Sequence, residues 1–110
     1  MKVNILGTEY TIKECKVDED NYLNDCDGYC DKSSKTIVVC DRRENSELSD
    51  WEWYKKKVMR HEIIHAFLFE SGLAENWEHS YKFGHDETVV DWIAMQFPKI
   101  LEVYRKVGCL

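Results

Sequence analysis

Two histidines and a glutamate form the stretch of this sequence best suited to chemistry. His61-Glu62-Ile63-Ile64-His65 is an H-E-x-x-H motif within a segment whose apolar residues have helical spacing. Because positions four apart lie one above the other on a helix, His61 and His65 can present two imidazole nitrogens to one metal ion. Glu62 projects toward the same region, where it can accept a proton from a metal-activated water. The motif predicts a Zn²⁺ site with Glu62 as the general base.

A catalytic zinc site of this kind needs a third protein ligand. We expect this ligand on a second helix, near whose start Glu87 and Asp91 are spaced by four residues. Glu87 is the predicted ligand. Asp91 would accept a hydrogen bond from the far nitrogen of a ligating histidine and so fix its tautomer. The rival ligands are Asp86, His85 and His79.

The residues directly after the motif exclude one alternative source of the third ligand. The metzincin extension requires glycine and histidine at positions 68 and 71, where this chain has Leu68 and Ser71. A carboxylate further along the chain is therefore the better choice.

The motif followed by Glu87 and Asp91 resembles the gluzincins, zinc metallopeptidases whose third ligand is a glutamate on a later helix. Its layout is similar to that of minigluzincins and of the ImmA/IrrE-type metallopeptidases of mobile elements and phage. The run 87–98 is similar to the E-x-x-A-x-x-x-A-x-x-L-x-x-P helix of the latter, with Asp91 and Trp92 in place of smaller residues. The resemblance covers residues 35–98.

This resemblance implies a small zincin-like α+β domain. A short N-terminal antiparallel sheet with an edge strand would precede the motif helix, and a ligand helix would follow it. Residues 37–40 would form the edge strand, on which a peptide could pair as an added strand. An oxyanion donor is also required, and the candidates are His79, Tyr81 and His85.

The elements before the motif are short. Residues 3–6 and 10–16 alternate apolar and polar residues and predict a β-hairpin, with residues 7–9 between the strands. Residues 17–31 are acidic and rich in turn-forming residues, which predicts a loop or an irregular helix. Residues 35–41 are rich in β-branched residues and give the clearest strand.

The motif helix should begin near Ser49, because Ser49 and Glu52 form a capping box, and it should end at Gly72. Residues 73–85 then read as a connecting loop. A second helix over residues 86–97 would be broken or kinked by Pro98, with a third helical segment over residues 100–107.

Length and composition predict one folded domain over residues 1–110, since 44% of the residues are hydrophobic and 13% aromatic. A net charge of −6 argues against a nucleic-acid partner. The basic run Lys55-Lys56-Lys57 reads as a solvated helix face. With no apolar run of membrane-spanning length and no signal-peptide pattern at the N-terminus, we expect no membrane association and a cytoplasmic location.

Five cysteines are an odd number and, without an export signal, do not predict a disulfide framework. Cys26 and Cys30 form a C-x-x-x-C pair that Cys40 or Cys15 could complete as a second metal site. Free, mostly buried thiols are the favoured interpretation.

Two functions follow from these expectations. The first is a zinc metallopeptidase, an endopeptidase of narrow specificity acting on a peptide or protein substrate; by the resemblance, a repressor would be a natural target. The second is a non-catalytic, zinc-stabilised binding module of mobile-element or phage origin. Retention of Glu62 favours the enzyme, because a structural zinc site needs no general base.

Overall fold

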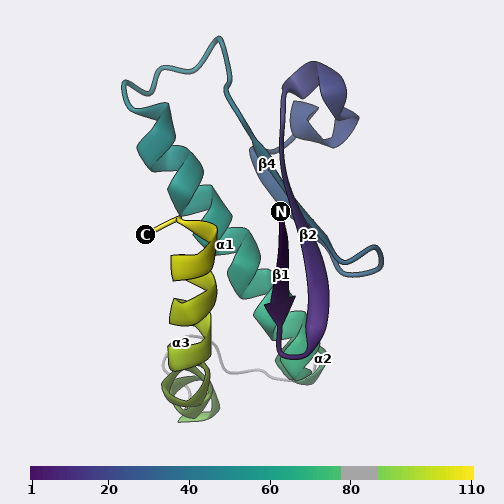
Figure 1. Cartoon of the computed structure of the whole chain (residues 1–110), viewed down its shortest axis with the longest axis vertical. Coiled ribbons are helices and arrows are strands. Elements are labelled where there is room, and N and C mark those ends of the chain that lie inside the picture. The colour runs from purple at the N-terminus through teal and green to yellow at the C-terminus, as the bar shows by residue number, and fades with distance from the viewer. Residues whose placement is uncertain (78–86) are drawn as a thin grey trace.

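The computed structural model describes residues 1–77 and 87–110. Figure 1 shows a small sheet on one side of a long helix, with a second long helix packed against both. In chain order the elements are β1 (Lys2–Ile5), β2 (Thr8–Cys15), the 3-10 helices η1 (Val17–Glu19) and η2 (Asn21–Asn24), β3 (Gly28–Asp31), β4 (Thr36–Cys40), α1 (Trp51–Ser71), α2 (Leu73–Trp77) and α3 (Glu87–Val107). The α+β class predicted from the sequence is confirmed.

The four strands form one mixed sheet in the order β1-β2-β4-β3. The predicted hairpin of β1 and β2 is confirmed, although its turn contains only Leu6 and Gly7 because β2 already begins at Thr8. β4 pairs with β2 in parallel and with β3 in antiparallel register. The expectation of a purely antiparallel sheet is therefore wrong.

The prediction that residues 37–40 form the edge strand is also wrong, because β4 lies inside the sheet. Its side chains are buried on both faces: Ile37 and Val39 pack toward α1, and Val38 and Cys40 pack with Leu23 on the opposite face. A strand buried on both faces belongs in the interior of a sheet. The edge strands are β1 and β3, and β3 lies in a segment that the sequence predicts as a loop or irregular helix.

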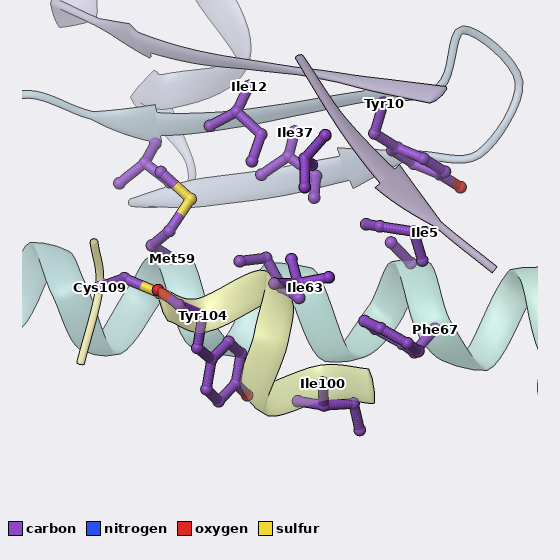
Figure 2. Packing of buried hydrophobic residues seen from close by; sticks show 14 residues of the cluster. Ile5, Tyr10, Ile12, Ile37, Met59, Ile63, Phe67, Ile100, Tyr104 and Cys109 are labelled. Atoms are coloured by element: carbon purple, nitrogen blue, oxygen red, sulfur yellow. The ribbon is translucent and has the colours of Figure 1, made fainter. Parts of the chain in front are cut away.

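The motif helix α1 runs back along the sheet and packs its buried face into the core between the sheet and α3. The Asp50 side chain accepts a hydrogen bond from the Trp53 amide at 3.0 Å, so Asp50 caps the helix and not Ser49. The helix ends before Gly72, as predicted. Figure 2 shows Met59, Ile63 and Phe67 of α1 packed against the apolar residues of the sheet.

Helix α3 closes the other side of this core. Ile100 and Tyr104 are buried against α1 (Figure 2), and the Trp92 indole donates a hydrogen bond to Ser71 Oγ at 3.0 Å. Of the two outcomes predicted at Pro98, the break is wrong, since α3 runs through it as one helix. An internal proline costs a helix roughly 3 kcal/mol, and the contacts on both sides of Pro98 offset that cost.

Between the two long helices, the predicted loop over residues 73–85 begins as the short helix α2. None of the helices in the described part of the chain has the length and apolar character needed to span a membrane.

Candidate metal centre

His61 and His65 converge on one side of α1. Their Nε2 atoms lie 3.1 Å apart, and their ring centroids lie 4.8 Å apart with the rings at 69° to each other. The His65 ring also stacks on Phe69, with 6.1 Å between centroids. The i, i+4 spacing on a regular helix is what brings the two imidazoles together.

The separation of the two nitrogens fits a zinc ion. Two nitrogens bound to zinc at about 2.0–2.1 Å with a tetrahedral angle between them lie roughly 3.3 Å apart. The observed 3.1 Å is close to that value and needs no change of helix geometry. Burial, and then the positive charge of His61, lower the pKa of His65. Its ring therefore stays neutral, as a metal ligand must be, to a lower pH than an ordinary histidine.

Glu62 is the buried charged residue beside this pair, with only 7% of its surface exposed. Burial raises the pKa of its carboxyl, and the charge of His61 opposes this shift. Within residues 1–77 and 87–110, no side chain donates a hydrogen bond to it. A buried carboxylate with a raised pKa is a stronger base than an ordinary, solvated glutamate, which suits it to accept a proton.

Strand β3 passes close to Glu62 because it begins with a glycine. A Cβ atom on Gly28 would lie 2.6 Å from Val58 Cγ1 and 3.4 Å from Glu62 Cγ. The Asp27 carbonyl accepts a hydrogen bond from the Cys40 amide at 2.8 Å. Because hydrogen-bonded and non-bonded pairs alternate along an antiparallel ladder, Gly28 and Cys30 direct their own amides and carbonyls away from β4. Among the described residues, no strand pairs with this outer side of β3, which lies beside Glu62.

A hollow of about 210 Å³ lies between this edge and the first half of α1. His61 and Glu62 form one end of it. The rest is lined by Asp27, Gly28, Tyr54, Lys57 and Val58. The lining residues from α1 lie one and two helical turns before the motif, so they could be predicted from their spacing in the sequence. Nothing in the sequence points to Asp27.

The predicted third ligand lies on α3, whose first residue is Glu87. The hydrogen bond from Trp92 to Ser71 holds the first half of α3 beside the end of α1. The side chains of Glu87 and Asp91 lie outside the described residues, as do residues 78–86, which include His79, Tyr81, His85 and Asp86. Within the described part of the chain, no three His, Cys, Asp or Glu side chains form a group that could hold a metal.

All five cysteines are free thiols, among which Cys40 and Cys109 are buried. Burial, and then the charge of Glu62, raise the pKa of Cys30 to about 12. A thiol protonated at neutral pH is a poor metal ligand. Among the described residues, which include every cysteine, the second metal site considered from Cys26, Cys30 and Cys40 or Cys15 is not formed.

The basic run on α1 is not one solvated face. The Lys55 side chain is only 11% exposed, and its ammonium lies 3.1–3.2 Å from carboxylate oxygens of Glu14, Asp41 and Glu52. It joins the ends of β2 and β4 to the first turns of α1. Lys56 and Lys57 are exposed.

The chain matches no protein-family model, no curated protein and no solved structure. The candidate metal centre therefore rests on the residues and geometry of this chain alone.

Proposed function

We propose that this protein is a zinc-dependent peptidase that hydrolyses peptide bonds at the centre formed by His61, His65 and Glu62. The observation that carries the proposal is the convergence of the two Nε2 atoms, 3.1 Å apart, next to a buried carboxylate. A helix that only filled a core would gain nothing from a buried acid that receives no side-chain hydrogen bond from the described residues, since such a group costs stability. This combination favours catalysis over packing.

The roles of the residues follow from their chemistry. His61 and His65 hold the metal, Glu87 completes the ligand set, and Asp91 accepts a hydrogen bond from a ligating histidine. Bound zinc supplies Lewis acidity, which polarises the substrate carbonyl and lowers the pKa of water. The Glu62 carboxylate would accept a proton from the attacking water and would return it to the leaving amine. The candidates for the oxyanion donor are His79, Tyr81 and His85.

The substrate is a peptide or protein segment that pairs with β3. The outward-facing amide and carbonyl of Cys30 and the carbonyl of Gly28 offer main-chain hydrogen bonds, whereas the Gly28 amide already donates to the Cys26 sulfur. Gly28 also lies against Glu62. β3 takes the part that the resemblance to gluzincins assigns to the strand before the motif helix. The proposed arrangement is zincin-like, with β3 in place of the strand before the motif helix as the edge strand.

A comparison of the zinc-loaded wild type with Glu62→Gln tests the function. Both are incubated with a mixed peptide library, and the products are identified by mass spectrometry. We expect cleavage by the wild type, loss of cleavage by at least about a hundredfold in Glu62→Gln with zinc retained, and full activity in the surface control Glu47→Gln. Zinc binding without cleavage by the wild type would refute the peptidase and leave a zinc-stabilised binding module.

A further inference from the structure

The direction of a bound peptide follows from the way β3 and α1 lie together. The start of β3 is against the middle of α1, where Gly28 approaches Val58 and Glu62. Beyond the end of β3, Lys32 Nζ lies 5.3 Å from the centroid of the Phe69 ring, two turns further along α1. β3 and α1 therefore run in the same direction.

A peptide that pairs with β3 in the more stable antiparallel direction runs opposite to α1. Its N-terminal part lies toward Phe69 and its C-terminal part lies toward Tyr54. The hollow is on the Tyr54 side of Glu62. The residue that follows the cleaved bond consequently faces the hollow.

The charged side chains that line the hollow differ in whether they already have a hydrogen-bond or ion-pair partner. The Asp27 carboxylate is already engaged, because Arg43 Nε donates to it at 2.8 Å and the Tyr54 hydroxyl donates to it at 2.9 Å. The Lys57 ammonium lies 5.7 Å from the centroid of the Tyr54 ring and has no ion-pair partner among the described residues. Among the described residues that line the hollow, Lys57 is thus the cation without an ion pair, and Glu62, at the far end, is the carboxylate without one.

We propose that Lys57 determines the specificity of this site by selecting a carboxylate in the residue that follows the cleaved bond. This inference rests on the proposed function. The carboxylate can be the side chain of Asp or Glu, or the terminal carboxylate of a peptide that ends at this residue. Lys57 holds it by an exposed ion pair, which is worth up to about fivefold in the rate constant kcat/KM.

The test uses the full-length, zinc-loaded chain and a mixed peptide library, supplied with free and with amidated C-termini. Mass spectrometry reads the new N-terminal residue of each product. We expect Asp and Glu to exceed Asn and Gln by up to about fivefold at that position. Cleavage that is strongest one residue from a free C-terminus, and is lost on amidation, would instead assign the terminal carboxylate.

Charge reversal at Lys57 supplies the decisive variant. Lys57→Glu should lose the acidic preference and favour Lys and Arg, whereas Lys56→Glu makes the same charge change at a position that does not line the hollow and should keep the wild-type preference. Absence of an acidic preference in the wild type, or equal behaviour of the two variants, would overturn the proposal.

A binding measurement separates this inference from the proposed function. Chemical shifts of ¹⁵N-labelled Glu62→Gln are recorded with an acidic peptide pool and with the same pool in which Asn and Gln replace Asp and Glu. Binding of the acidic pool that is lost when Lys57→Glu is added to Glu62→Gln, without cleavage by the wild type, supports the role of Lys57 and refutes the peptidase. Cleavage without any Lys57-dependent preference refutes only the role of Lys57. Neither cleavage nor binding refutes both.

Discussion

Gly28 of β3 lies against Val58 of α1 so closely that no side chain fits between them. A Cβ atom added to Gly28 would be 2.6 Å from Val58 Cγ1 and 3.1 Å from the Val38 carbonyl oxygen. This contact sets how near the free edge of the sheet comes to Glu62. The position of the β3 edge relative to Glu62 therefore depends on this contact.

Replacing Gly28 by alanine should therefore destabilise the protein and move β3 away from the centre. Val58 is β-branched and has little rotamer freedom on a helix, so it cannot turn aside. We expect Gly28→Ala to lower the free energy of unfolding by about 1–3 kcal/mol, as measured by urea denaturation. Gly28→Ala should cost less free energy of unfolding in the Val58→Ala background than in the wild type, because the shorter side chain leaves room for the added Cβ atom. Additive losses would contradict the contact.

Glu70 ties the hairpin to the end of α1 and makes stability depend on pH. It accepts hydrogen bonds from Thr8 Oγ1 at 3.0 Å, from the Tyr10 hydroxyl at 2.7 Å and from Lys35. Burial alone would raise the pKa of Glu70, but the hydrogen bonds from Lys35, Tyr10 and Thr8 outweigh it and lower the pKa. The stabilisation is then present above the ordinary glutamate pKa of about 4.3 and is lost as the pH falls through the lowered value.

Glu70→Gln should remove this stabilisation. At pH 7 we expect a loss of about 1–2 kcal/mol in the free energy of unfolding. The difference from the wild type should shrink as the pH falls below about 4. Denaturation curves between pH 3 and pH 7 check this, with the exposed Glu47→Gln as control. A difference that stays constant over that range would show that the Glu70 charge has no role.

Glu62 should have the opposite linkage, because its raised pKa means that the folded state disfavours its charge. In the metal-free protein, stability should fall as the pH rises through the ordinary pKa toward the raised one. Glu62→Gln should therefore raise the free energy of unfolding of the metal-free protein at pH 7 by about 1 kcal/mol. Calorimetric melting in the presence of a chelator measures it. A less stable Glu62→Gln would mean that the carboxylate serves the fold.

The residue patterns within a segment predicted the parts of the fold that form within that segment or between neighbouring segments. The hairpin, β4 and the end of α1 at Gly72 are of this kind. β3 could not be predicted, because its sequence Gly-Tyr-Cys-Asp has no β-branched residue and becomes a strand by pairing with β4. The run of α3 through Pro98 depends in the same way on distant contacts, such as the burial of Ile100 and Tyr104.

Only the part of the candidate site that lies within one helix could be predicted from the sequence. The approach of His61 to His65 is a property of one helix and could be predicted from their spacing. The burial of Glu62 could not be predicted, since it depends on β3 packing against α1. The hollow needs Asp27 and Gly28 from a segment that precedes the motif by more than thirty residues. No pattern near the motif predicts that pairing.

The most direct test of the metal centre is the zinc content of the purified chain by elemental analysis. We expect about one zinc per wild-type chain, loss of zinc in His65→Ala and Glu87→Ala, and retention in His79→Ala, His85→Ala and Asp86→Ala. Loss in one of the last three variants, with retention in Glu87→Ala, would transfer the third ligand to that residue. A wild-type chain that holds no zinc after incubation with the metal would contradict the account at its centre, because His61 and His65 would then have no metal to bind.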